Sequence, residues 1–393
     1  MLRKIEHFGY VLTDQTGWPR FWSTAWSLLA GAGLAPATLK KRLLHIDDFY
    51  AHVESTLPPT HLDDALNTLK FEQIEDLLES YFVSLRNVSK VSSSIGERWR
   101  TNLNFCRDIS ERLARSDATG ARFADIAVRL ERLERLYGQL RPPKPQTVTF
   151  VRALPAAVLE ELYSNVVPGA EKNPFPNPTT QWRVYATFLL LLHQGLRRSE
   201  TLILPVDFLK HERSAKGVQY WLNVKATSQE DDSRYSTPSI KTVSSIRQIP
   251  VSATTAQALM AYAENYRGNQ NHSYFLSSAK NRPLSAEGVN YFLRLLSRSL
   301  SKTALKMLED RTGMHSISPH DLRHTAAVIR MKQLLSKGDP MPEALQKMRS
   351  FFGWARDSTM PQLYAKAAFE ERLATVWSDE FDERTAMLME LPE

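Results

Sequence analysis

A proline-rich segment, RPPKPQT at residues 141–147, divides the chain into two parts of different character. Its three prolines fix φ and remove backbone N–H donors, so neither a helix nor a central strand can run through it. A chain of 393 residues is long enough for two domains that each bury a core. We therefore predict one domain over residues 1–145 and a second over residues 146–393, with this segment as the linker.

Helical periodicity dominates the first part. Within residues 36–55, the apolar side chains Leu39, Leu43, Ile46 and Tyr50 recur at the spacing of one helix face. Three more amphipathic segments follow, FEQIEDLLESYFVSL, SSSIGERWRTNLNFCRDISERLAR and ARFADIAVRLERLERLYGQL. We expect an all-helical first domain.

The pattern changes after the linker. Helical patterns at about 154–166 and 181–193 precede β-like runs at 219–224 and 247–252, and helices resume from about 285. The longest apolar stretch, TFLLLLHQGL, is shorter than the roughly 20 residues that a membrane span requires, so we predict a buried helix. The predicted fold class is mainly α with a small antiparallel β-sheet: a helical N-terminal domain and a mixed α+β second domain.

Charge and cysteine content limit the possible partners and sites. The net charge is +7, but residues 365–393 hold eight acidic and three basic residues, so the rest of the chain is more basic still. A basic body favours a polyanion partner, nucleic acid first, although a soluble basic protein without such a partner has the same composition. The single cysteine, Cys106, excludes an intramolecular disulfide framework and a multi-cysteine zinc site. The N-terminus resembles no secretion signal, so we expect a protein inside the cell without membrane association.

Four separate motifs carry the side chains most suited to chemistry. They are HQGLRRSETLIL at 193–204, SIKTVSSIRQIPV at 239–251, SISPHDLRHTAA at 316–327 and FFGWARDSTMPQLYAK at 351–366. Their candidate residues, in chain order, are Gly195, Arg197, Glu200, Lys241, His320, Arg323, His324, Trp354 and Tyr364. Each motif alone is weak, because an arginine near a glutamate is usually a surface salt bridge and a lone histidine is usually structural.

Taken together and in this order, the motifs resemble the signature of the tyrosine recombinase (phage integrase) family over roughly residues 150–370. That signature runs G-x-R-x-x-E, a hairpin lysine, H-x-x-R-H, L-G-H/W and a tyrosine. The resemblance implies a site-specific recombinase or integrase that cuts and rejoins DNA through a 3′-phosphotyrosyl intermediate without metal, ATP or another cofactor. It also implies a helical, SAM-like core DNA-binding domain over 1–145 and a catalytic domain over 146–393 with a C-terminal helical tail from about 365.

The resemblance gives each matched residue a role. Tyr364 is implied as the nucleophile, Arg197 and Arg323 as the groups that hold the non-bridging phosphate oxygens, and Lys241 as the proton donor to the leaving 5′-oxygen. Guanidinium groups suit this task because they stay charged and donate paired hydrogen bonds to phosphate. Lys225 is a rival for the lysine position, because a long polar insertion separates the two lysines.

The histidines have several possible roles. His320 matches the family histidine that accepts a proton or binds phosphate, and Trp354 stands where members carry histidine or tryptophan. An indole N–H only donates, so the base role shifts to His320. Glu200 is expected to orient Arg197, and His324 to support the site. The i, i+4 histidine pair could chelate zinc, but an arginine lies between them, and we predict no metal.

The implied partner is double-stranded DNA with specific recombination sites, bound by a homo-oligomer that is a tetramer in synapsis, with DNA-bending proteins as possible accessories. Six basic residues of the first domain are expected to contact phosphates. These are Lys40, Lys41, Arg42, Arg98, Arg100 and Arg107. A type IB topoisomerase and a non-catalytic DNA-binding protein are the alternative functions. The family's usual distribution implies a bacterial mobile element and a cytoplasmic, nucleoid-associated protein.

Overall fold

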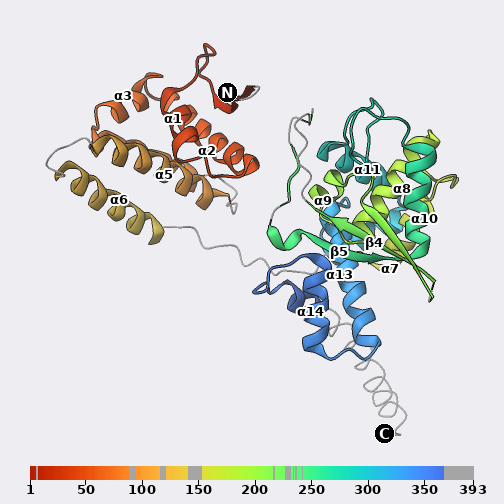
Figure 1. Ribbon diagram of the computed structural model, residues 1–393. Coiled ribbons are helices and arrows are strands. Elements are labelled where there is room, and N and C mark those ends of the chain that lie inside the picture. The colour runs from red at the N-terminus through yellow and green to blue at the C-terminus, as the bar shows by residue number, and fades with distance from the viewer. Residues whose placement is uncertain are drawn as a thin grey trace, which may run out of the picture. The chain divides into compact units, whose positions relative to one another are not determined.

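The computed structural model describes residues 1–5, 8–87, 94–115, 121–139, 153–215, 217–225, 232, 234, 237–240 and 242–366. The chain forms two compact units, Met1–Val148 and Thr149–Glu393, drawn in Figure 1. Beyond residue 366, the predicted C-terminal tail lies outside the described residues. None of the described helices is long and apolar enough to cross a bilayer.

The first unit consists of a short hairpin followed by helices. Strands β1 (Leu2–Ile5) and β2 (Gly9–Leu12) pair antiparallel. The helices are α1 (Phe21–Leu29), α2 (Pro36–Glu54), α3 (His61–Asn67), α4 (Phe71–Arg86), α5 (Ile95–Ala114) and α6 (Ala121–Gln139). The prediction of an all-helical first domain is wrong for the hairpin, because strands of four residues are too short to show an alternating pattern.

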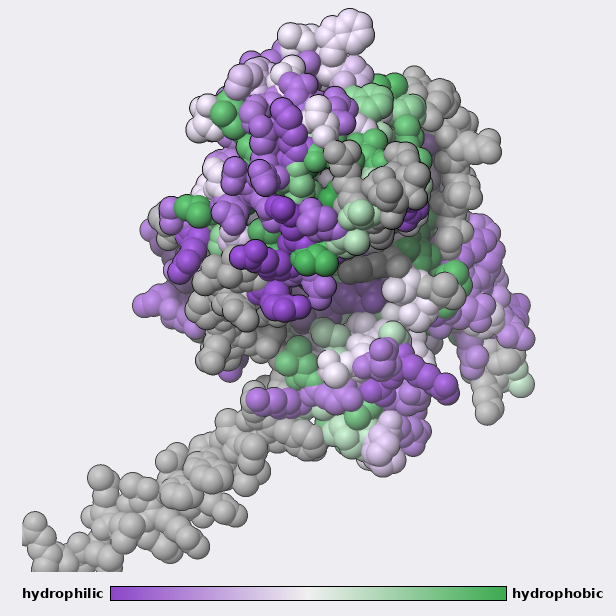
Figure 2. All heavy atoms as spheres, turned by 90° about the vertical axis from the view of Figure 1, so that its left-hand side faces the viewer, coloured by the Kyte–Doolittle hydropathy of each residue, from purple (hydrophilic) through white to green (hydrophobic). Residues whose placement is uncertain are grey.

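The helices of the first unit pack as their periodicity predicts. Helix α2 buries Leu43, Ile46 and Tyr50, and Leu39 packs half-buried against the same core. In Figure 2, hydrophilic side chains predominate on the face in view, with smaller apolar patches between them. Burial of one helix face against neighbouring helices therefore supplies the core of this unit.

The second unit combines helices with a three-stranded antiparallel sheet in the order β3-β4-β5. The strands are β3 (Leu209–Ser214), β4 (Gly217–Val224) and β5 (Arg247–Val251). The helices are α7 (Ala156–Val166), α8 (Pro178–Leu192), α9 (Arg198–Ile203), α10 (Ala253–Ala261), α11 (Ala286–Arg298), α12 (Lys302–Thr312), α13 (Pro319–Ser336) and α14 (Met341–Phe352). Short 3-10 and π-helical segments occupy Val243–Ser245 and Tyr262–Tyr266. The predicted fold class is confirmed, because the structure is mainly helical with small antiparallel sheets.

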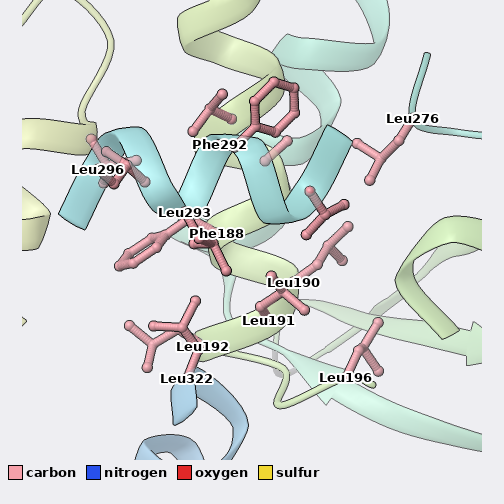
Figure 3. Close-up of a cluster of buried hydrophobic side chains, with 14 of the residues drawn as sticks. Phe188, Leu190, Leu191, Leu192, Leu196, Leu276, Phe292, Leu293, Leu296 and Leu322 are labelled. Carbon is pink, nitrogen blue, oxygen red and sulfur yellow. The ribbon is translucent and has the colours of Figure 1, made fainter. Parts of the chain in front are cut away.

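Helix α8 is the central core element of the second unit. It begins at Asn177, whose side chain accepts a hydrogen bond from the backbone N–H of Thr179 (2.8 Å). Residues 186–192 are all buried, and Figure 3 shows side chains of this run beside Phe292 and Leu293 of α11 and Leu322 of α13. A helix that is apolar on every side must be enclosed by other elements. The prediction of a buried helix here is confirmed.

Shortening a side chain of α8 should destabilise the second unit. Leu190 is 0% exposed, so Leu190→Ala leaves a cavity and is expected to lower the free energy of unfolding by about 2–5 kcal/mol. Val218 on β4 is 40% exposed, and Val218→Ala is expected to change it by less than about 0.5 kcal/mol. Calorimetric unfolding of both variants measures the difference. Equal losses would contradict the central place of α8.

Candidate active site

A cleft of about 890 Å³ in the second unit brings together five of the predicted site residues. They are Arg197, His320, Arg323, Trp354 and Tyr364. The other residues that line the cleft are Arg198, Ser199, Asn290, Arg294, Ser316, Ile317, Ser318, Pro319 and Met360. Residues separated by more than 160 positions in the sequence thus meet at one surface.

Glu200 does not line the cleft, but its carboxylate pairs with three arginines. Its carboxylate is 2.5 Å from Nη1 of Arg197, 3.1 Å from Nη2 of Arg247 and 3.8 Å from Nη1 of Arg323. The side chain of Glu200 is only 1% exposed, and its Oε2 also accepts the backbone N–H of Arg197 (2.9 Å). Burial alone would raise the pKa of this carboxyl, but the guanidinium groups, Arg247 first, bring it below its usual value. The expected orienting role of Glu200 toward Arg197 therefore has a geometric basis.

The same three arginines also hold the end of α14. Nε of Arg247 donates to the carbonyl of Phe351 (2.7 Å), Nη2 of Arg323 to that of Phe352 (2.7 Å), and Nη2 of Arg197 to that of Gly353 (3.2 Å). These carbonyls belong to the C-terminus of the helix, where partial negative charge accumulates. The arginines therefore fix the turn that leads directly to Trp354.

Two glycines permit the close contacts around this turn. Gly353 ends α14 with φ +60°, and Gly195 ends the turn after α8 with φ +57°. A Cβ on Gly195 would overlap the ring of Phe352. The residues Leu196 and Leu322, which directly precede Arg197 and Arg323, are buried in the core and are labelled in Figure 3. The backbone that carries each of the two arginines is thus held in place by a buried leucine of the core.

Arg323 is the most enclosed cation of the cleft. It is 4% exposed, donates from Nη1 to the carbonyl of Gly195, and lies 5.7 Å from the ring centre of Trp354. Burial, together with the nearby charge of Arg197, lowers the pKa of Arg323 to about 9. That value is above neutral pH, so the guanidinium stays charged at neutral pH.

The start of α13 positions both histidines. Ser318 caps the helix: its Oγ accepts the backbone N–H of Asp321 (3.4 Å), and the Asp321 carboxylate accepts the backbone N–H of Ser318 (2.8 Å). His320 is exposed at the cleft, whereas His324, one turn later, is 7% exposed. Their rings lie 4.1 Å apart, edge to face. One histidine therefore lines the cleft, whereas the other is buried and is not part of its lining.

Tyr364 lies on a helical segment at residues 360–366 and is 1% exposed. Its hydroxyl is 2.6 Å from Nδ1 of His324, and its ring stacks on Trp354 with ring centres 5.4 Å apart. Burial raises the pKa of the phenol well above its usual value, and the guanidinium of Arg323 acts in the opposite direction. The phenol is therefore protonated at neutral pH, with an imidazole nitrogen within hydrogen-bonding distance.

The structure does not test the prediction for the lysine. Lys241 is outside the described residues, so its role stays a prediction, and its rival Lys225 is an exposed residue directly after β4.

The six basic residues proposed for phosphate contact all belong to the first unit, on α2 and α5, and none lines this cleft. Most already have intramolecular partners: Lys41 pairs with Glu97, Arg98 with Asp48 at 3.5 Å, and Arg107 with Glu134 at 2.7 Å. Nε of Arg100 donates to the carbonyl of Gly96 (3.1 Å), and the Lys40 ammonium lies 5.7 Å from the ring centre of Tyr10. Arg42 is half-buried.

Sequence reasoning missed several polar residues at the site, three arginines and an asparagine among them. Arg247 was read only as part of a β-like run, yet it bonds to both Glu200 oxygens (3.2 and 3.1 Å). Arg198, Asn290 and Arg294 line the cleft, and Nη1 of Arg198 donates to Oδ1 of Asn290 (3.0 Å). An arginine that opens a strand of mostly apolar residues is the signal that could have identified Arg247.

Neutralising Glu200 should release the three arginines. Glu200→Gln leaves buried guanidinium groups without their carboxylate and is expected to cost about 3–5 kcal/mol of stability at neutral pH. Because the pKa of Glu200 is lowered on folding, its contribution is present above the unfolded value of about 4.3 and is lost as the pH falls through the folded value. The stability difference between the wild type and Glu200→Gln should therefore shrink below about pH 4.3.

Denaturant unfolding at several pH values measures this difference. Glu212→Gln, at an exposed position on β3, is the matched control and should behave as the wild type. A constant difference down to the lowest pH at which the protein folds would contradict the ion-pair explanation.

Comparisons with known proteins place the chain in a family. A model of the phage integrase family matches residues 169–371, which is just over half of the chain. Among solved structures, the chain is similar to one described as the crystal structure of XerA recombinase, at 14% identity and a TM-score of 0.37, over 90% of this chain and 97% of that one. No curated protein matches the chain significantly. The family match agrees with the ordered motifs predicted from the sequence, and the chain therefore belongs to the phage integrase family, the tyrosine recombinases.

Proposed function

We propose that this protein is a site-specific recombinase that cuts and rejoins double-stranded DNA through a 3′-phosphotyrosyl intermediate, in the integration or excision of a DNA element. The observation that carries the proposal is the meeting of Arg197, His320, Arg323, Trp354 and Tyr364 around one cleft. A nucleophile, two guanidinium groups and two further donors are the groups that metal-free phosphodiester cleavage requires.

In the proposed cleavage step, the Tyr364 oxygen attacks the scissile phosphorus. The bond from phosphorus to the 5′-oxygen breaks, and a phosphotyrosine bond replaces it. The phenol proton passes to Nδ1 of His324, which lies 2.6 Å from the hydroxyl. Lys241, by family resemblance, gives a proton to the leaving 5′-oxygen. Attack by a 5′-hydroxyl of the partner strand reverses the step and rejoins the DNA, so no ATP is consumed.

Charge on the phosphate is proposed to be balanced by Arg197 and Arg323. A guanidinium has five N–H donors, so the bonds that hold these arginines to Glu200 and to backbone carbonyls leave others for phosphate oxygens. The pKa of Arg323 at about 9 keeps it charged at neutral pH. The indole N–H of Trp354 is a third proposed donor. Loss of one such positioned donor typically costs about 2.7–4 kcal/mol of transition-state stabilisation.

The geometry favours different tasks for the two histidines. His324 is in hydrogen-bond range of the nucleophile and is buried, whereas His320 is exposed at the cleft, where a phosphate would lie. We therefore assign proton acceptance to His324 and phosphate binding to His320. This assignment differs from the one that the sequence suggests, in which His320 is the base.

Binding of DNA is proposed to involve both units. The basic residues of α2 and α5 would exchange acidic partners such as Glu97 and Asp48 for DNA phosphates, which makes affinity strongly dependent on salt. The first unit would serve as the core DNA-binding domain and the second as the catalytic domain. We also propose that four protomers act together on two recombination sites. The proposed location is the bacterial cytoplasm, on nucleoid DNA.

A covalent complex is the direct test of the nucleophile. On a nicked suicide substrate, the wild type is expected to form a protein–DNA adduct in the presence of EDTA, because no metal takes part in the proposed step. Tyr364→Phe should form none, since the attacking oxygen is removed. Tyr291→Phe, at an exposed tyrosine on α11, is the matched control and should form the adduct. Denaturing gel electrophoresis measures it, and an adduct with Tyr364→Phe would overturn the assignment.

Substitution of His324 separates proton acceptance from simple positioning. Glutamine can keep a hydrogen bond to the Tyr364 hydroxyl but cannot take its proton, whereas phenylalanine can do neither. Both His324→Gln and His324→Phe are expected to slow cleavage by about 10²–10⁴-fold. The rate of His324→Gln should rise with pH, because solvent base then ionises more of the phenol. A near-normal rate for His324→Gln in single-turnover cleavage would reduce His324 to a positioning residue.

A further inference from the structure

The short 3-10 segment Val243–Ser245 places a buried serine hydroxyl beside Arg197. Ser245 is 0% exposed and does not line the cleft, so we expect it to make no contact of its own with DNA. Its Oγ accepts a hydrogen bond from Nη1 of Arg197 (3.0 Å). Because a guanidinium nitrogen only donates, the serine oxygen is the acceptor whichever way its own hydrogen points. A buried hydroxyl is thus bonded to a cation that lines the cleft.

The backbone of Ser245 is held on several sides. Its carbonyl accepts from Nη1 of Arg247 (2.7 Å), and its N–H donates to the carbonyl of Thr242 (3.0 Å). A Cβ on Gly353 would lie 3.0 Å from the Cα of Ser245, so the turn at the end of α14 packs directly against the serine. The hydroxyl oxygens of Ser245 and Thr242 are also 3.0 Å apart. These contacts fix the serine oxygen independently of Arg197.

Three of the five N–H donors of Arg197 are already used. Nη1 donates to Oε1 of Glu200 (2.5 Å) and to Oγ of Ser245, and Nη2 donates to the carbonyl of Gly353 (3.2 Å). Among the described residues, the N–H of Nε and the second hydrogen of Nη2 have no acceptor. Two donors on one guanidinium are what a bidentate phosphate contact requires.

The serine oxygen decides which donors remain. Without it, one hydrogen of Nη1 has no acceptor, and the guanidinium gains by turning that hydrogen toward solvent in the cleft. We propose that Ser245 is a positioning residue that determines which N–H groups of Arg197 face the scissile phosphate. This inference rests on the proposed function, in which Arg197 holds that phosphate.

Lys241 offers a second route from Ser245 to the reaction. It directly precedes Thr242 in the sequence, and Thr242 bonds to Ser245 through its carbonyl. The experiments must therefore separate an effect on Arg197 from an effect on the lysine.

Single-turnover cleavage of the nicked suicide substrate tests the role in the reaction. Ser245→Ala is expected to lower the rate at saturating DNA by about tenfold or more, because a hydrogen bond to a charged group is lost. The DNA concentration that gives half the maximal rate should change little. Ser277→Ala removes another serine hydroxyl at 0% exposure, away from the cleft, and should cleave at the wild-type rate. An unchanged rate for Ser245→Ala would overturn the proposal.

A substrate with sulfur in place of the scissile 5′-oxygen distinguishes the arginine from the lysine. A thiolate leaves without being protonated, so this substrate should restore cleavage by Lys241→Ala. Ser245→Ala should stay slower than the wild type on it, because the phosphate contact is still impaired. Restoration of Ser245→Ala would overturn the proposal and assign the serine to the lysine. Failure to restore Lys241→Ala would count against the lysine in the proposed function, not against Ser245.

Equilibrium unfolding in denaturant tests the contact without catalysis. Ser245→Ala should destabilise the wild type more than it destabilises Arg197→Met, because the bond it removes is absent from that variant. Equal losses in the two backgrounds would overturn the proposal. Unequal losses, together with a wild type that forms no covalent adduct, would instead overturn the proposed function and leave the contact in place.

Discussion

The buried carboxylate of Glu200 is the interaction on which the cleft of this recombinase depends. An isolated carboxylate at 0% exposure would be costly, and three separate guanidinium groups without it would repel one another. Each arginine comes from a different element: Arg197 precedes α9, Arg247 opens β5 and Arg323 lies in α13. The ion cluster therefore joins a helix start, a strand and a second helix at one point.

The ion cluster also fixes the direction of the chain at the end of α14. Three consecutive carbonyls at the end of this helix each accept from a different arginine. The partial negative charge of the helix C-terminus therefore adds to the carboxylate of Glu200 in balancing the positive charge of the three arginines. On the other side of the site, Arg323 and Arg330 hold the carbonyls of Gly195 and His193 in the turn after α8.

The sequence predicted the parts of this structure that depend on local pattern. The apolar run of α8 and the helix face of α2 follow from periodicity, and the four ordered motifs identified the family. Contacts between distant segments could not be predicted in this way. Arg247 looks like any polar residue in a strand until Glu200 is brought beside it, 47 positions away. The hydrogen bond between Tyr364 and His324 likewise depends on how α13 meets the segment that carries the tyrosine.

The parallel stack of Phe352, Trp354 and Tyr364 has a mechanical consequence. The indole stacks on both the Phe352 ring and the phenol, so a phenol that swings out toward a phosphate loses its stacking contact with the indole. Such aromatic contacts are worth about 0.5–1.5 kcal/mol beyond the area they bury, which corresponds to a factor of roughly 2 to 12 in the population of the displaced state. If Tyr364 is the nucleophile, as proposed, the stack restrains it weakly until a bound duplex supplies compensating contacts.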